Sequence, residues 1–146
     1  MNPNIELLHA EFEQLGKLFP GTPLPPNCFT FMKADYVDYE SRMILKISFP
    51  VLPEYLNPML GMQGGFIVAA FDNVFGPLSY LSARMPCTTL DLHSNYIRPI
   101  LVRDTLVITA KVVSRGLSTL HMSGEAANAK GKLIATCSTH MMIMKK

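Results

Sequence analysis

Charged residues and cysteines are scarce in this chain of 146 residues, and tryptophan is missing altogether. Only 16% of the residues are charged, whereas 49% are hydrophobic. This composition excludes an intrinsically disordered protein and is typical of a compact globular one. A chain of this length buries roughly two-thirds of its unfolded surface when it folds. We therefore expect one domain over residues 1–146, and the low charge hints that a partner chain covers part of its apolar surface.

The few cysteines and histidines form no recognisable motif. Cys28, Cys87 and Cys137 are far apart, with no C-x-x-C pair, so they predict neither a disulfide framework nor a zinc site. The four histidines have no ligand-like spacing either. Met1–Asn4 lacks the basic start and apolar core of a signal peptide. The sequence thus predicts a cytoplasmic protein that needs no metal and no cofactor.

Long hydrophobic runs and basic clusters are also missing. The longest uninterrupted apolar run, Phe66 to Phe71, is much shorter than the roughly 20 residues that span a membrane, so we expect no membrane insertion. Basic residues never occur three in a row, and no nucleic-acid-binding motif is present. Residues 1–72 carry 4 basic and 8 acidic side chains, a net −4, and residues 73–146 carry 9 and 3, a net +6. The basic half favours an anionic ligand such as a nucleotide, although scattered solvated side chains give the same charge.

Two helices are predicted from the pattern of apolar residues. Between Ile5 and Phe19 they recur at steps of three and four, which predicts a short amphipathic helix capped by Asn4 and ended by Pro20-Gly21. The proline-rich residues 22–27 predict a loop. The second helix, over residues 66–84, is apolar on nearly all sides, which is typical of a buried helix.

The remaining segments predict antiparallel strands. Strand-like composition bounded by turn residues is found over residues 29–39, 42–49, 88–98, 105–114, 118–128 and 132–144. Short turns join several of them, so neighbouring strands should pair antiparallel. A sheet curled around the buried helix accommodates this order of elements. A second chain can extend such a sheet at an open edge.

Candidate chemistry is concentrated at the start and middle of the buried helix. Gly64-Gly65 marks its start, where unshielded backbone N–H groups at the positive end of the helix dipole can hold an oxyanion. A tight turn alone would also explain two glycines. Asp72 stands among apolar residues, where a carboxylate is costly and where burial makes it a stronger base. A carboxylate that is hydrogen-bonded for structure is the alternative.

The stretch from Asn57 to Asp72 resembles the PaaI-like branch of the 4-hydroxybenzoyl-CoA thioesterase superfamily. That branch has an Asn, then His-Gly-Gly six residues later, then an Asp on its central helix. Asn57, Gly64 and Asp72 stand at matching positions. The resemblance continues through residues 89–92, 95–99 and 131–135. It implies an α+β hotdog fold, an antiparallel β-sheet wrapped around a long central helix, with an additional N-terminal helix in this chain.

The resemblance implies an acyl-CoA thioesterase and gives each matching residue a role. Gly64 would donate its N–H to the thioester carbonyl, and Asp72 would activate water or attack directly. Asn57 would position water or the carbonyl, and Thr89 stands where the family often has Ser or Thr near the nucleophile. Gln63 departs from the pattern because the family usually has His there. Glutamine cannot titrate near neutrality, although it can donate and accept hydrogen bonds.

Two other functions remain open on the sequence. The first is a non-catalytic hotdog protein that binds acyl-CoA or another apolar ligand. The second is a hotdog dehydratase or hydratase, which is disfavoured because no His lies at the glycine pair or in the helix. The sequence does not define the acyl group, so aromatic, medium-chain and long-chain substrates are all compatible with it.

The helix spacing predicts a homo-oligomer with active sites between subunits. Gly64 and Asp72 are eight residues apart, about 12 Å along a helix axis. An Asp side chain recovers only a few ångströms by leaning toward the N-terminus. One thioester carbon cannot easily reach both groups of one subunit, so we expect a dimer or a dimer of dimers. We further expect Arg98 or Arg115, near strand ends in the basic half, to contact the phosphates of CoA.

Overall fold

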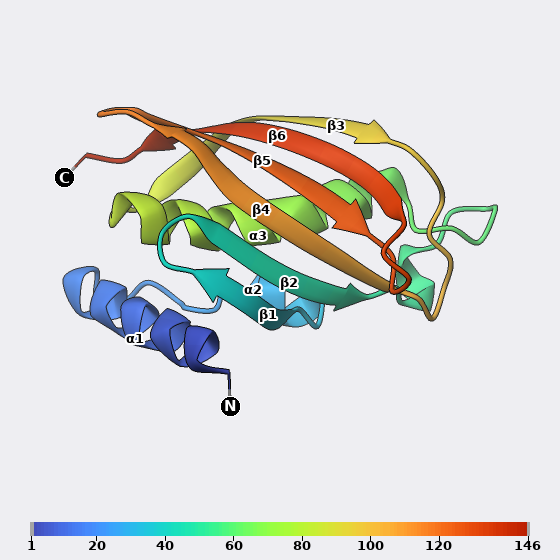
Figure 1. Cartoon of the computed structure of the whole chain (residues 1–146), viewed down its shortest axis with the longest axis horizontal. Coiled ribbons are helices and arrows are strands. Elements are labelled where there is room, and N and C mark those ends of the chain that lie inside the picture. The colour runs from blue at the N-terminus through green and yellow to red at the C-terminus, as the bar shows by residue number, and fades with distance from the viewer. Residues whose placement is uncertain (1, 146) are drawn as a thin grey trace.

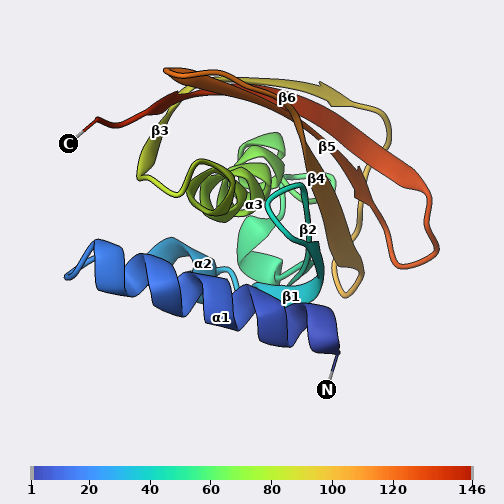
Figure 2. The same ribbon diagram turned by 60° about the vertical axis from the view of Figure 1, so that its left-hand side comes forward.

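A curved antiparallel sheet wraps around one central helix. The computed structural model describes residues 2–145, so the terminal residues Met1 and Lys146 of the predicted domain lie outside the described residues. Helix α3 (Gly64–Ala83) lies in the concave side of the six-stranded sheet (Figure 1). Helices α1 (Pro3–Leu18) and α2 (Asn27–Phe31) lie on the other side of α3, as the turned view in Figure 2 shows. The α+β arrangement predicted from the sequence is confirmed.

The strands do not follow one another in sequence order within the sheet. They are β1 (Asp35–Glu40), β2 (Ile44–Pro50), β3 (Cys87–Tyr96), β4 (Thr105–Arg115), β5 (Thr119–Ala127) and β6 (Leu133–Ile143). Their order is β1-β2-β4-β5-β6-β3, and every neighbouring pair is antiparallel. After α3 the chain crosses the sheet, so β3 pairs with β6 and not with β4. Within the described residues β3 has a strand on one side only, and it forms an edge of the sheet.

The N-terminal helix begins earlier than predicted. Oδ1 of Asn2 accepts a hydrogen bond of 2.9 Å from the N–H of Asn4, so Asn2 is the cap, and Asn4 already lies inside α1. Pro3 explains the difference, because its fixed φ and missing N–H are suited to the first position of a helix. Leu8 and Leu15 are the buried residues of this helix.

The strand predicted over residues 29–39 is wrong in its first half. Residues 27–31 form α2, and β1 begins only at Asp35. The carbonyl of Pro26 accepts hydrogen bonds from the N–H groups of Phe29 and Thr30, which starts the helix. Lys33, with φ of 53°, ends the turn. Phe29 and Met32, three residues apart, are buried together, a helical spacing that the short apolar run concealed.

The core lies between α3 and the sheet. Ile67, Phe71, Val74, Phe75 and Leu78 are buried along the helix. Gly124 of β5 faces two of them, and a Cβ there would lie 3.1–3.3 Å from the rings of Phe75 and Phe71, so a side chain at this position would push the rings back by a few tenths of an ångström.

Helix α3 begins two residues before the predicted start, with Gln63 as its N-cap, and Pro77 lies inside it without ending it. It is long and apolar enough to cross a membrane, but it is mostly buried inside the fold, as the core helix of a soluble protein is. The cytoplasmic location stays a prediction.

Candidate active site

Asp72 and Thr89 meet between α3 and β3. The Thr89 hydroxyl donates a hydrogen bond of 3.0 Å to Oδ1 of Asp72. Both residues are partly exposed, so α3 is not enclosed on all sides as its composition predicted. Burial raises the pKa of the nearby Cys137 thiol to about 11, and the negative charge of Asp72 contributes to the shift. The Cys137 thiol and the Asp72 carboxylate therefore lie close enough to interact electrostatically.

A β-bulge turns Thr89 toward the helix. The register between β3 and β6 shifts between Thr89 and Asp91, so that Thr89 pairs with the buried Met141 and Asp91 pairs with the exposed His140. In a regular strand, residues two apart face the same side of the sheet. The extra residue of the bulge breaks this rule and separates the two side chains. Thr89 thus faces Asp72, while Asp91 faces His140.

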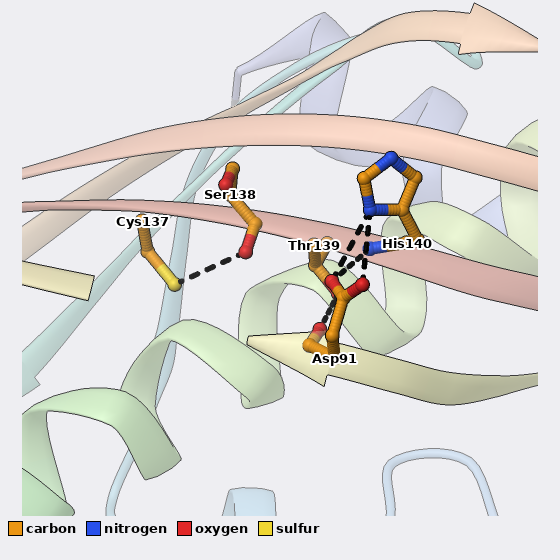
Figure 3. Close-up of polar contacts among 5 residues, drawn as sticks. All are labelled: Asp91, Cys137, Ser138, Thr139 and His140. Atoms are coloured by element: carbon orange, nitrogen blue, oxygen red, sulfur yellow. Dashed lines mark hydrogen bonds and ion pairs between the residues drawn. The ribbon is translucent and has the colours of Figure 1, made fainter. Parts of the chain in front are cut away.

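Asp91 and His140 form a polar cluster of their own (Figure 3). Nδ1 of His140 lies 3.1 Å from Oδ2 of Asp91, and the backbone N–H of His140 donates to Oδ1 at 2.9 Å. This N–H, first among several contacts, holds the pKa of Asp91 below its usual value. The ring of His121 stacks on that of His140 with centroids 4.4 Å apart. Over residues 2–145, no group of three His, Cys, Asp or Glu side chains is placed to hold a metal ion.

Asn73 is turned away from Asp72. Its Oδ1 accepts a hydrogen bond of 3.1 Å from the Cys28 thiol, and its Nδ2 donates to the carbonyl of Ala69 at 3.0 Å and toward the sulfur of Met32 at 3.4 Å. The side chain is 7% exposed. Asn73 therefore fastens α2 to the central helix, and Thr89 is the side chain that partners Asp72.

An open cleft of about 450 Å³ adjoins Asp72. One wall is α3, a second is formed by β3 and β6, and a third by the loop after α1 and the start of α2. Apolar side chains dominate this lining, and Asp72 is its one charged residue. The cleft can therefore hold an apolar group beside the carboxylate.

Gly64 lies at the start of α3 under the ring of Tyr96. The Tyr96 hydroxyl donates a hydrogen bond of 2.8 Å to the carbonyl of Gly64. A Cβ on Gly64 would lie 2.9 Å from Cζ of Tyr96, so a side chain at this position requires the exposed Tyr96 ring to shift. Gly65 differs, because a Cβ there would meet its nearest neighbour, Oε1 of Gln63, at 3.7 Å. The first N–H groups of a helix have no intrahelical acceptor, so those of the glycine pair remain available to a ligand.

Asn57 and Gln63 frame the loop that leads to the glycine pair. Oδ1 of Asn57 accepts hydrogen bonds from the N–H groups of Met59 at 2.9 Å and Gly61 at 3.1 Å. Its carboxamide oxygen is thus occupied by the loop, and no hydrogen bond within residues 2–145 engages its NH₂ group. Gln63 is exposed, and its backbone N–H donates to the carbonyl of Tyr55 at 2.7 Å.

The predicted site residues fall into groups at different places in one chain. Asp72 and Thr89 lie together at the middle of α3, whereas Asn57, Gln63 and Gly64 lie at its N-terminal end. The helix between Gly64 and Asp72 is unbroken, so about 12 Å along the axis separates the two groups.

Arg98 and Arg115 lie near opposite ends of α3. Arg98 is exposed and donates to the carbonyl of Leu133 at 3.0 Å, close along the chain to Tyr96 and hence to the N-terminal end of the helix. Arg115 donates to the carbonyl and the hydroxyl of Ser82 at 2.8 and 2.9 Å, near the C-terminal end. Within one chain the two guanidinium groups therefore do not share a phosphate site.

Comparison with known proteins gives the family. The family model described as thioesterase superfamily matches residues 62–135, about half of the chain and the part that carries α3, β3, β4, β5 and the first residues of β6. The chain belongs to the thioesterase superfamily. None of the curated proteins compared with it matches in sequence.

Solved structures share the fold of this thioesterase-superfamily protein. The E. coli PaaI protein from the phenylacetic acid degradation operon superimposes with a TM-score of 0.82 and 18% identity, covering 95% of this chain and 96% of that one. A putative thioesterase from Ralstonia eutropha, described as related to phenylacetic acid degradation, has a TM-score of 0.74 and 25% identity over 88% of this chain and 97% of that one. A Streptococcus mutans protein bound to acetyl-CoA has a TM-score of 0.74 and 23% identity over 88% and 97%. The PaaI-like hotdog fold implied by the sequence is confirmed.

Two contributors to the site of this superfamily member were missed in the sequence. Tyr96, which covers Gly64, lies near the end of the strand predicted over residues 88–98, whose pattern gave no sign of a contact with the glycine pair. Residues 22–27 were predicted only as a loop, yet together with Cys28 they form a wall of the cleft. Asn73 could have indicated this wall of the cleft from the sequence. A polar residue at a core position of a helix requires a partner from another segment, and here that partner is Cys28.

Proposed function

We propose that this protein hydrolyses an acyl-CoA thioester with Asp72 at the reacting carbonyl. The observation that carries the proposal is the half-buried Asp72 carboxylate, which is held by Thr89 at the edge of an apolar cleft. The cleft is suited to the acyl group. With the acyl group in the cleft, the thioester carbon would lie next to the Asp72 carboxylate. The thioesterase superfamily and the acetyl-CoA bound to a protein of the same fold support this substrate class.

In the proposed reaction the C–S bond breaks and water supplies the new C–O bond. Asp72 either removes a proton from water as it attacks or attacks first and forms an anhydride that water then cleaves. The CoA thiolate leaves and takes up the proton that water has lost, so the Asp72 carboxylate is regenerated. The Thr89 hydroxyl fixes the orientation of Oδ1, which leaves Oδ2 to face the substrate. No metal or cofactor takes part in this proposal.

The oxyanion donor in the proposal comes from a second subunit. About 12 Å separates Gly64 from Asp72 in one chain, which is too far for a single tetrahedral carbon. Strand β3 carries Thr89 and is an edge of the sheet, so a second copy can pair along it. Exposed apolar side chains at Leu90 and Ile97 lie in or next to this strand and favour such pairing. A dimer of this kind brings Gly64 of one chain, with Asn57 and Gln63, toward Asp72 of the other.

A non-catalytic acyl-CoA-binding protein is the second candidate. Gln63 favours it, because glutamine stands where the resembling enzymes usually have a histidine and cannot exchange a proton near neutrality. The geometry of Asp72, Thr89 and the cleft is compatible with binding alone.

Release of free CoA separates the two candidates. Purified protein is incubated with saturated acyl-CoAs and with benzoyl-CoA and phenylacetyl-CoA, and the free thiol is measured with a chromogenic disulfide. The proposal requires catalytic release with at least one of them, and this release must be lost in Asp72→Asn. If the wild type binds these compounds by calorimetry but releases no thiol, the protein is a binder.

A further inference from the structure

One face of α3 forms the floor of the cleft. Ala69, Asp72, Gly76 and Tyr80 line it, and their spacing of three and four residues places them in a row along one side of the helix. Thr89 and Met141 stand on one side of this row, and the segment from Thr22 to Cys28 stands on the other. The row therefore leads from the carboxylate of Asp72 toward the C-terminal end of α3.

We propose that this cleft is a channel that selects a linear, unsubstituted acyl chain of about eight to twelve carbons. The length follows from the helix, because Asp72 and Tyr80 are eight residues or about 12 Å apart along its axis. An extended chain advances about 3.5 Å for every three bonds, so about ten bonds cover this distance. The inference rests on the proposed thioesterase function, to which it adds the substrate class.

The chemistry of the walls favours a plain hydrocarbon chain. Beyond Asp72 the lining carries no charge that could pair with a charged acyl group. The carboxamide of Asn73 is occupied by Cys28, Ala69 and Met32, and the Thr89 hydroxyl donates to Asp72. The remaining hydroxyls of the lining belong to Thr22 and Tyr80, and Tyr80 lies two helical turns beyond Asp72. Beside Asp72, a ring hydroxyl or a second carboxylate on the substrate would therefore lose its water without gaining a partner, which is costly. Apolar methylene groups have no such cost.

Gly76 leaves the middle of the channel open. A Cβ at this position would have nothing within 4 Å, so the space above the helix is empty there. Gly76 lies four residues after Asp72, about 6 Å along the axis, which corresponds to about five bonds of an extended chain. A larger side chain at Gly76 should therefore block the channel after about five or six carbons, whereas a smaller one at Tyr80 should lengthen it.

The first test is a chain-length series with the wild-type protein. Saturated acyl-CoAs from four to sixteen carbons are hydrolysed under identical conditions and kcat/KM is measured for each, with phenylacetyl-CoA beside them. We expect kcat/KM to rise about fourfold for each added methylene while the channel fills, and then to level off or fall beyond about ten to twelve carbons. A flat series, or phenylacetyl-CoA as the best substrate, would overturn the inference.

Two substitutions then shift the optimum in opposite directions. Gly76→Leu should lower kcat/KM for the ten-carbon substrate to about that of the four- to six-carbon ones, and Tyr80→Ala should raise it for fourteen and sixteen carbons. Gly76→Ala is the matched control for strain before Pro77, since any residue with a Cβ is disfavoured there in a helix. Gly16→Leu is the control for adding a leucine outside the cleft. Gly16 lies on α1, and a Cβ there also meets nothing within 4 Å. Unchanged chain-length profiles in both Gly76→Leu and Tyr80→Ala would contradict the channel.

Binding of S-alkyl-CoA thioethers separates this inference from the proposed function. These compounds have the same chain lengths and cannot be hydrolysed, and their affinities are measured by calorimetry on the wild type and on both variants. A length optimum that Gly76→Leu shortens, together with no thiol release from any acyl-CoA, would keep the channel and remove the enzyme. Hydrolysis without any length dependence would keep the enzyme and remove the channel.

Discussion

Thr89 on β3 donates a hydrogen bond of 3.0 Å to Oδ1 of Asp72 on α3. The bond joins an edge strand to the central helix and exists because the bulge after Thr89 turns its side chain inward. No other hydrogen bond of the described residues engages the Asp72 carboxylate. One oxygen is therefore fixed, and the other is free to face the cleft.

Replacing Thr89 by Val should slow turnover with little effect on KM. Val has nearly the same shape but no hydroxyl, so the carboxylate loses its fixed orientation. A hydrogen bond to a charged group contributes about 1.5–3 kcal/mol, which corresponds to a fall in kcat of roughly 10- to 100-fold if the whole contribution is lost. Thr89→Ser should recover most of the activity. Steady-state kinetics on the three proteins decide the matter, and equal kcat in the Val and Ser variants would exclude this positioning role.

Asp72→Asn should nearly abolish hydrolysis while the fold persists. Asn keeps the shape and can still accept the Thr89 hydrogen bond, but it can neither attack nor take up a proton. Loss of general-base help costs about 10²–10⁴-fold, and loss of a nucleophile costs more. The melting temperature should hold or rise, because a charge is removed from a largely apolar site.

Gln63→Ala provides the internal comparison for Asp72→Asn. Its side chain is exposed and can act only by hydrogen bonding, so we expect a smaller loss of activity. Thermal melting and turnover are measured on the same samples. A folded Asp72→Asn protein that turns over at nearly the wild-type rate would remove Asp72 from the mechanism and favour the binding protein.

The two glycines at the start of α3 should respond differently to alanine. Gly64→Ala forces the Tyr96 ring to move, since the new Cβ would lie 2.9 Å from Cζ, and this disturbs the hydrogen bond from the Tyr96 hydroxyl to the Gly64 carbonyl at the start of α3. Gly65→Ala is the matched control because its Cβ meets nothing closer than 3.7 Å. We expect Gly64→Ala to lower kcat/KM by at least tenfold more than Gly65→Ala, in the range measured for a lost oxyanion donor. Equal effects would show that the Tyr96 contact does not matter for activity.

Mixing Gly64→Ala with Asp72→Asn should raise the activity above that of either variant alone if the site lies between subunits. A heterodimer of Gly64→Ala and Asp72→Asn has one site with both changes and one site with neither. Random assortment into twofold dimers then recovers about a quarter of the wild-type activity. The variants are unfolded and refolded together, and sedimentation confirms the dimer. No recovery in a mixture that forms heterodimers, or a fully active monomer, would contradict the shared site.

Arg98 and Arg115 should differ in their contribution to CoA binding. Arg98→Gln removes an exposed charge, so we expect KM to rise at low salt and the difference to shrink as salt screens the interaction. Arg115→Gln removes the hydrogen bonds to Ser82, so it should also lower the melting temperature. KM values at two salt concentrations and thermal melts test both. If neither variant changes KM at low salt, these residues do not contact the phosphates.

The sequence by itself determined the central helix, the spacing of Gly64 and Asp72 along it, and the positions of most strands. These features depend on local patterns: an apolar stretch begun by two glycines, and runs of strand-forming residues between turns. The same local reasoning failed over residues 29–39, because a short apolar run is compatible with a strand or a helix. In the structure, the hydrogen bonds to the Pro26 carbonyl and the joint burial of Phe29 and Met32 stabilise a helix there.

Only the tertiary structure decided what surrounds the Asp72 carboxylate. The pairing of β3 with β6 joins segments about 50 residues apart, and its bulge turns Thr89 inward and Asp91 outward. The packing of Tyr96 on Gly64 and of residues 22–28 against α3 likewise joins distant parts of the chain. Such contacts depend on how whole elements pack and on which backbone groups still need a hydrogen-bond partner. A local sequence pattern does not contain this information. For that reason the sequence could indicate Asp72, but only the fold shows the cleft beside it.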